Sequence, residues 1–454
     1  MRIYERLKSW TLDNVLLVLI LLLGSVILSR LAPTLVNYTN TVAAPEEFVS
    51  QANVAGDFWN GVIKPAILMK HGENFYLSTG IYGPSLSVIT IPLLEFAQNR
   101  GLCFEATCTS IFYQWLLLAA ICGYAFFIFW ITHTHPEARP VFLLFLFAFL
   151  LGIPGSMGLV RGNVDILYSL LFGIVLVLAQ SKTDHKTKTN LFVPIIVGIL
   201  LGFLTNSKLF FLPFSILIIL TTPGAPAIAA VSILTFFAFL YLPHVYGAPS
   251  TLTQLLDATK NFEQSVTFTT YDSINFNHSF TAFTSLATDA VSRQSWHPNR
   301  EYKIIGILSG ILFLFTFVLP IVMDVPMRLL KKIPRYVRHL LAHRCDNRLQ
   351  ILAIVYVIAF INLVPEISFN YRLYYSLPLL FILYLDTKHR STARWYLILS
   401  LCFLGIKGLW VLMTQEPKGM TIFDIRATNV FVVLHFFFLI KAAIAHVLDY
   451  SSRE

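Results

Sequence analysis

The chain has 454 residues, of which 56% are hydrophobic and 13% are charged, and its mean hydropathy is +0.69. These figures exclude an ordinary soluble enzyme, in which about 25% of residues carry charge. The net charge is +9, but topology gives membrane proteins a basic balance, so this charge does not imply nucleic-acid binding. We therefore expect one integral membrane domain over residues 1–454.

Long apolar runs recur along the whole chain. A helix needs about 20 mostly apolar residues to cross a bilayer, and runs of about 15 can cross when their polar ends reach the interface. On this loose criterion the sequence predicts an all-α polytopic membrane protein with about 12 transmembrane helices. The runs cover residues 14–33, 111–132, 139–155, 163–180, 191–205, 209–222, 226–245, 301–323, 350–365, 373–386, 395–413 and 428–447.

The first run has full spanning length, and no small-residue cleavage site precedes Ala32. We therefore expect it to stay in the protein as a membrane helix rather than to be removed as a signal peptide.

A thirteenth run, residues 85–98, contains Pro92 and Glu95 and fits either a crossing or a helix lying at the interface. The basic loops discriminate between these possibilities. If the run does not cross, the basic segments 2–8, 182–188, 328–348 and 388–394 all share the side of the N-terminus, as the positive-inside rule requires. We therefore predict an interfacial helix here, with both termini in the cytoplasm.

This topology places two large segments outside, residues 34–110 and 246–300, and a basic loop, residues 324–349, in the cytoplasm. Two of the five cysteines, Cys103 and Cys108, fall in an external segment. A short-loop disulfide between them is feasible if the outside is oxidising. No further Cys or His lies near them at ligand spacing, so the sequence predicts no metal site and no cofactor.

Ionisable residues gather at the outer ends of the predicted helices. Each one costs about 2.5 to 3.5 kcal/mol at the centre of a membrane helix, so each needs a partner or a function. Five separate segments deliver polar groups to one leaflet. The residues are Asp57, Arg161, Asn163, Asp165, Lys208, His278 and Arg372.

Structural explanations compete at several of these positions. Arg161 and Asp165 are four residues apart and can form a pair on one helix face. Lys208 could reach the outer headgroups along its aliphatic stem. Arg372 could form a local ion pair with Glu366.

Asp57 is the hardest of these residues to explain structurally, because Phe58 and Trp59 follow it and favour a partly buried position. A carboxylate in an outward-facing cleft can act as a general base, and Lys, Arg or His side chains can hold a phosphate. His278 is either a loop histidine or one of these cations. Because Asp57 has no Asp-x-Asp partner and no His/Cys cluster near it, we expect metal-independent chemistry.

Short motifs follow one another in a recognisable order. They are Asp57 after the first helix, Tyr82-Gly83-Pro84, Gly162-Asn163, Lys208 with Pro213, Asn277-His278-Ser279 and the Tyr-rich stretch 371–375. This order resembles the GT-C fold glycosyltransferases of the GT87 type, which include polyprenyl-phosphate-dependent mannosyl- and arabinofuranosyltransferases of bacterial envelopes. The resemblance runs from about residue 50 to residue 385, and its specificity lies in the order of the motifs.

The resemblance implies a GT-C-like helical bundle with an active site on the outer face of a bacterial plasma (inner) membrane. It implies that Asp57 deprotonates an acceptor hydroxyl in one inverting displacement. The implied substrates are a polyprenyl-phosphate-linked sugar donor and a glycan or glycolipid acceptor. Substrate-binding residues by this mapping are Tyr82, Asn163, Asp165, Asn277, Ser279 and Tyr374, and the candidate cations for the donor phosphate are Lys208, Arg161 and Arg372, with His278 added on chemical grounds.

One motif departs from the family. Where the family often has Gly-Gln-x-Asn, this chain has Arg161-Gly162-Asn163-Val164-Asp165, so the family's Gln and the details of sugar contact that depend on it have no counterpart here.

Two other functions compete. A transporter or lipid-linked sugar flippase should have internal repeats and charges near the midplane, and no repeat is visible. A polysaccharide polymerase of the O-antigen type usually relies on Arg-rich outer loops, and the segment 246–300 carries only Lys260, Arg293 and Arg300 as Lys or Arg. Replacing Asp57 discriminates among them, because only a base-catalysed transferase depends on that carboxylate.

Overall fold

The computed structural model describes residues 56–76, 83–103, 106–151, 163–180, 192–222, 224–265, 308, 311–312, 347–364, 370–387, 391–414 and 425–451. Within these ranges the chain is helical and contains no strand, which confirms the predicted all-helical class. The elements that carry the argument below are α2 (Gly56–Phe58), η3 (Trp59–Ile63), α3 (Lys64–Lys70), α5 (Ser85–Asn99), α6 (Ala106–Ile131), η4 (Pro136–Ala138), α7 (Arg139–Leu151), α9 (Asp165–Gln180), α10 (Phe192–Ser207), η5 (Leu209–Phe211), α11 (Leu212–Thr221), α12 (Ala225–Tyr241), η6 (Leu242–Tyr246), α13 (Leu252–Ser265), α19 (Asn347–Leu363), η7 (Asn370–Tyr375), α20 (Ser376–Asp386), α21 (Ser391–Thr414) and α22 (Ile425–Ser451).

Ten of the twelve apolar runs fall in described segments, and each of these is helical. Two helical stretches, Ile111–Ile131 and Ala225–Tyr246, are long and apolar enough to cross a membrane by length and composition. The described chain also contains six shorter apolar helices. The number of helices that cross a membrane stays a prediction.

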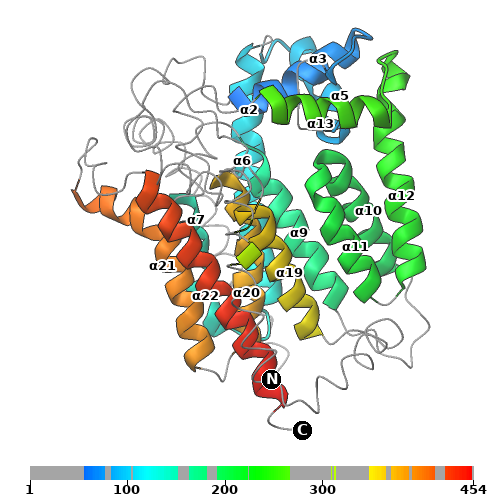
Figure 1. The fold of residues 1–454 in the computed structure, drawn as a ribbon. Coiled ribbons are helices and arrows are strands. Elements are labelled where there is room, and N and C mark those ends of the chain that lie inside the picture. Colours follow the sequence, from blue (N-terminus) through cyan, green and yellow to red (C-terminus); the bar gives the residue numbers. More distant parts are fainter. Residues whose placement is uncertain are drawn as a thin grey trace, which may run out of the picture.

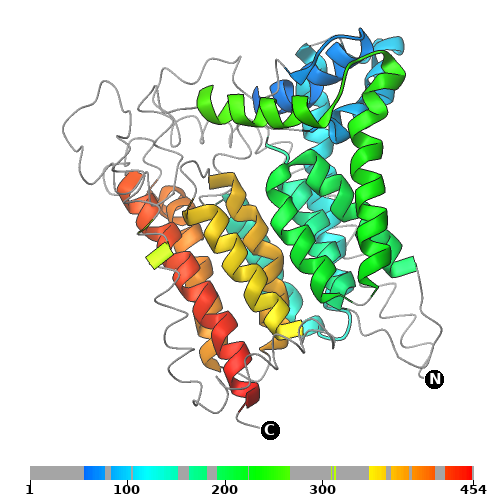
Figure 2. The same cartoon turned by 45° about the vertical axis from the view of Figure 1, so that its right-hand side comes forward.

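The long helices stand side by side in one bundle (Figures 1 and 2). Its centre is α20, where every residue from Ser376 to Leu383 is buried. α9 packs closely against α20, and a Cβ at Gly173 would lie 3.0 Å from Pro378. A glycine at this position therefore lets the middle of α9 approach the start of α20, and the start of α9 lies beside the end of η7, where Asp165 accepts from Tyr375.

Short helices close one end of this bundle. α2, α3, α5 and α13 gather there, and α13 lies across the ends of the long helices (Figure 1). α3, α5 and α13 share a core that includes Met69, Val88, Ile91 and Leu255, whereas Phe58 of α2 packs into the main core of the bundle. The run 85–98 is thus a helix at the end of the bundle, and its placement at a membrane interface stays a prediction.

A polar contact ties this end together as well. The Tyr76 hydroxyl and the Ser250 hydroxyl are 2.9 Å apart, joining the segment after α3 to the segment before α13. Burial raises the pKa of Tyr76 to about 12, against the opposing effect of the Ser250 hydrogen bond. The phenol is therefore neutral at physiological pH and can donate in this contact.

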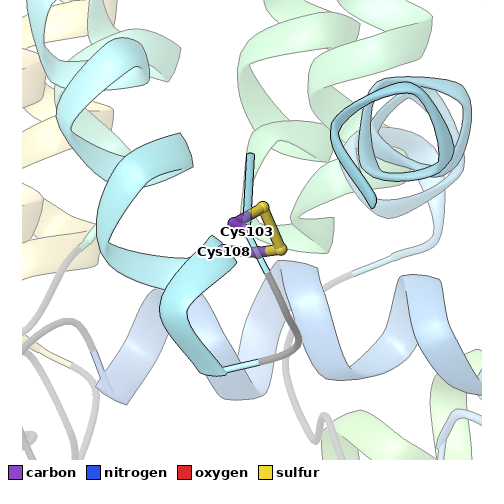
Figure 3. The surroundings of a disulfide bond; sticks show 2 residues. All are labelled: Cys103 and Cys108. Atoms are coloured by element: carbon purple, nitrogen blue, oxygen red, sulfur yellow. A yellow bond between two sulfur atoms is a disulfide. The ribbon is translucent and has the colours of Figure 1, made fainter. Parts of the chain in front are cut away.

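Cys103 and Cys108 form a disulfide between the end of α5 and the start of α6 (Figure 3). Both residues are buried and pack with Leu94 and Ala97 of α5. The bond fixes where α6 begins relative to the short helices that close the bundle.

Several predicted features lie outside the described residues. These are the first run (14–33), the run 301–323 apart from residues 308 and 311–312, the loop 181–190, residues 324–346 of the basic loop, and the site candidates Tyr82, Arg161, Asn277, His278 and Ser279.

Candidate functional site

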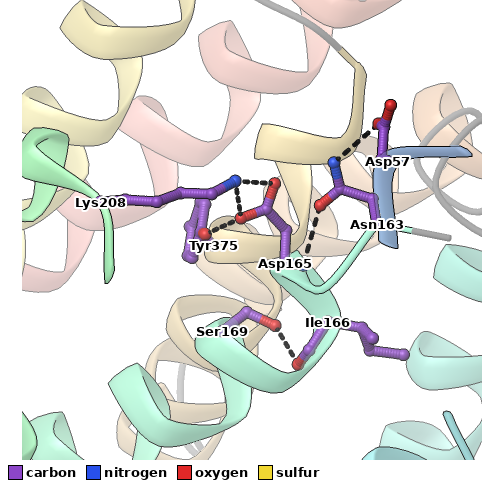
Figure 4. Close-up of polar contacts among 7 residues, drawn as sticks. All are labelled: Asp57, Asn163, Asp165, Ile166, Ser169, Lys208 and Tyr375. Carbon is purple, nitrogen blue, oxygen red and sulfur yellow. Dashed lines mark hydrogen bonds and ion pairs between the residues drawn. The ribbon is translucent and has the colours of Figure 1, made fainter. Parts of the chain in front are cut away.

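A buried ion pair lies where α9 begins. Asp165 is fully buried and Lys208 is 3% exposed. The Lys208 ammonium donates to both carboxylate oxygens of Asp165, at 2.6 and 2.8 Å. The Tyr375 hydroxyl donates to the same carboxylate (Figure 4). One carboxylate therefore joins α9, the turn between α10 and η5, and the end of η7.

Asn163 links this pair to Asp57. Its side-chain oxygen accepts the backbone N–H of Asp165 at 2.9 Å, and its amide nitrogen donates to Oδ2 of Asp57 at 3.3 Å (Figure 4). Asn163 is 2% exposed, whereas Asp57 in α2 is half-buried. The carboxylate of Asp57 thus lies at the edge of the buried network rather than inside it.

Arg372 of η7 is a second cation at this end of the bundle. It is half-buried, and its guanidinium carbon lies 5.8 Å from the ring centroid of Phe210. The Lys208 ammonium lies 5.8 Å from the centroid of the same ring. Lys208 interacts electrostatically with both Arg372 and Asp57. The site therefore combines two carboxylates with two cations, and both cations lie near the ring of Phe210.

A backbone clamp fixes the position of Lys208. The Gly83 N–H donates to the Ser207 carbonyl at 2.9 Å, and the Ser85 N–H donates to the Asn206 side-chain oxygen at 3.2 Å. A Cβ at Gly83 would lie 1.7 Å from the Asn206 carbonyl oxygen, so only glycine fits this approach. The Gly83-Pro84 motif therefore holds the end of α10, from which Lys208 extends.

Two buried tyrosines, Tyr113 and Tyr374, extend the network. Tyr113 of α6 packs against Phe58 with ring centroids 5.6 Å apart, and it interacts electrostatically with Asp57. Tyr374 is 1% exposed and interacts electrostatically with Tyr113 and Asp165. Its hydroxyl has no hydrogen-bond partner among the described residues. An unsatisfied buried hydroxyl costs roughly 1–3 kcal/mol, so this group is a candidate ligand for a polar substrate.

The structure gathers six sequence-predicted residues at one end of the bundle: Asp57, Asn163, Asp165, Lys208, Arg372 and Tyr374. Two of them have a different environment from the expected one. Lys208 is neither an open phosphate ligand nor a lysine reaching toward headgroups, because it is buried against Asp165. Asp165 accepts three hydrogen bonds from Lys208 and Tyr375 and is fully buried, which leaves it poorly placed to bind a sugar.

Sequence reasoning missed Tyr375, Tyr113 and Phe210. Tyr375 stands in the Tyr-rich stretch 371–375, but which of Tyr374 and Tyr375 bonds Asp165 depends on the rotation of η7 against α9. Tyr113 lies within an apolar helix beside Phe112, and no sequence signal separates it from an ordinary core aromatic.

Within the part of the chain that the structure describes, no group of three or more His, Cys, Asp or Glu residues could hold a metal ion. Comparison with protein-family models, with curated proteins and with solved structures found no match.

Proposed function

We propose that this protein is an integral membrane glycosyltransferase that moves a sugar from a polyprenyl-phosphate donor to an envelope glycan or lipid-linked acceptor. The observation that carries the proposal is that a half-buried carboxylate, Asp57, and a half-buried guanidinium, Arg372, both interact electrostatically with Lys208 of a buried ion pair at the end of an apolar bundle. A base and a phosphate-binding cation are the two groups that this reaction needs.

The apolar surface of the helices supports a membrane location. The stretch Ala225–Tyr246 has a mean hydropathy of 2.1, yet only 17% of it is buried inside the protein. Trp115 and Leu234 are 67% and 69% exposed. Large exposed apolar surfaces of this kind require a non-aqueous neighbour, and a lipid bilayer supplies one along the full length of the helices.

The proposed reaction is a single displacement at the anomeric carbon. The acceptor oxygen forms a bond to that carbon while the bond from the carbon to the phosphate oxygen breaks. The acceptor proton moves to the Asp57 carboxylate, and the polyprenyl phosphate leaves as an anion. Arg372 meets the negative charge that develops on the phosphate, because charge-assisted bonds to a guanidinium strengthen as that charge grows.

The assignment of phosphate-binding cations changes from that expected from the sequence. Lys208 acts indirectly in this proposal, since its charge is balanced by Asp165. Arg372 is the proposed phosphate ligand from the described residues. Arg161 and His278 keep their roles as candidates from the sequence alone.

Purified protein should be incubated with a panel of polyprenyl-phosphate sugars and lipid-linked acceptors. We expect transfer by the unaltered protein and a loss of about 10²- to 10⁴-fold in Asp57→Asn, which removes only the proton acceptor. Asp257→Asn is the matched control, because Asp257 is an exposed carboxylate on α13 at the same end of the bundle. Full turnover in Asp57→Asn would refute the base assignment.

The proposed outward orientation of the site has a separate test. A cysteine introduced at Lys260 of α13 should react with an impermeant reagent added to intact cells, and a cysteine at Lys332 should be protected. The opposite pattern would place the site in the cytoplasm and exclude a lipid-linked donor on the outer face.

A further inference from the structure

Asn163 uses both ends of its side-chain amide. The oxygen accepts the Asp165 N–H two residues further on, which is a local turn that fixes the plane of the amide. With that plane fixed, the amide nitrogen faces Oδ2 of Asp57 at 3.3 Å (Figure 4). Because the oxygen end of the Asn163 amide is held in this turn, its nitrogen end favours one orientation of the Asp57 carboxylate.

The turn itself is held in place from three directions. Asp165 is bonded to Lys208 from the end of α10 and to Tyr375 from η7, and it begins α9. Asp57 belongs to a different segment, α2, and Asn163 donates a hydrogen bond to it from the turn before α9. The orientation of Asp57 is therefore coupled to three elements that are distant from it in sequence.

We infer that Asn163 is a positioning residue for Asp57 and that the buried Asp165, Lys208 and Tyr375 cluster is the support that holds it. This inference rests on the proposed function and replaces the expectation that Asn163 binds the sugar. In the transfer step the proton moves from the acceptor hydroxyl to Asp57, and Asn163 neither gains nor loses one. Its effect is geometric, and a misplacement of about 1 Å at a reacting group can cost 10²-fold in rate.

Asn163→Asp is the sharpest variant. It keeps an oxygen to accept the Asp165 N–H, so the turn is retained, but it replaces the donor to Asp57 with a second carboxylate. We expect kcat to fall by about 10²-fold with little change in the KM for the donor. Ser169→Ala is the matched control in the first turns of α9, just after Asn163, because Ser169 bonds Tyr124 and a backbone carbonyl, and it should retain full turnover.

The exchange Asp57→Asn/Asn163→Asp separates the contact from the chemistry. It restores one amide donor facing one carboxylate, so the melting temperature should recover from the loss seen in Asn163→Asp. Transfer should not recover, because the base has moved to the other side of the contact. In the Asp57→Asn background, Asn163→Ala should cause no further loss of rate, since both residues act through the same group.

These readouts keep the two proposals apart. If no donor supports transfer by the unaltered protein, the proposed function fails, while recovery of the melting temperature in the exchange still measures the contact. If transfer occurs but Asn163→Asp raises the donor KM with kcat unchanged, Asn163 touches the substrate and the positioning role is overturned. Failure of the exchange to recover stability would overturn it as well.

Discussion

Replacing Lys208 by Met should destabilise the protein more than removal of any exposed charge. The change would leave the Asp165 carboxylate buried without the cation that now donates to it at 2.6 and 2.8 Å. Breaking a buried ion pair from one side costs about 3–5 kcal/mol, because the remaining charge is neither hydrated nor balanced. Tyr375 still donates to Asp165 in this variant, so we expect the lower part of that range.

Removing both charges should be less harmful than removing one. In Asp165→Leu/Lys208→Met no buried charge remains, and replacing a buried pair with apolar side chains is often close to neutral. The Tyr375 hydroxyl would lose its acceptor, which costs roughly 1–3 kcal/mol. The double variant should therefore lie between the unaltered protein and Lys208→Met in stability.

Lys70→Met provides the matched control. Lys70 and Glu95 form an ion pair at 3.6 Å, with side chains 35% and 43% exposed. Solvent screens such a pair, and its loss costs about 0–1 kcal/mol. Thermal unfolding of the four purified proteins in one detergent gives the comparison. If Lys208→Met lowered the melting temperature no more than Lys70→Met does, the reasoning would be refuted.

Three further predictions concern the surroundings of the site. Tyr374→Phe should keep or raise the melting temperature, because it removes an unsatisfied buried hydroxyl; if that hydroxyl binds a sugar, the KM for a substrate should rise, and a lower melting temperature would contradict the assignment. Gly83→Ala should lower the melting temperature far more than Gly405→Ala, since the new Cβ would lie 1.7 Å from a backbone oxygen at Gly83 and 3.4 Å from its nearest neighbour at Gly405; equal stability of the two variants would argue against the clamp. Mass spectrometry of non-reduced protein should find Cys103 and Cys108 in one disulfide-linked peptide, and two free thiols in oxidised membranes would contradict this.

Much of the fold follows from hydropathy alone. Each apolar run in the described ranges is a helix, because a backbone among apolar side chains satisfies its hydrogen bonds locally. Polar residues interrupt these apolar runs, and their positions in the sequence predicted that they lie at helix ends. Asp165 stands in the first turn of α9, and Lys208 stands directly after α10. The sequence thus identified which polar residues needed an explanation.

The partners of these residues depended on the packing of the helices. Sequence spacing allowed a pair between Asp165 and Arg161, which lies outside the described residues, but it could not indicate the lysine 43 positions away and the tyrosine 210 positions away that donate to Asp165. A buried carboxylate bonds the donors that packing brings to it, and the approach of α9 to α20 and the clamp on α10 determine which donors those are. The sequence by itself therefore determined the helices and the residues at their ends. Only the tertiary structure decided that Lys208 balances Asp165, that Asn163 faces Asp57 and that Arg372 is the half-buried cation near Lys208. The reason is that contacts between distant segments arise from the packing of helices and not from spacing along the sequence.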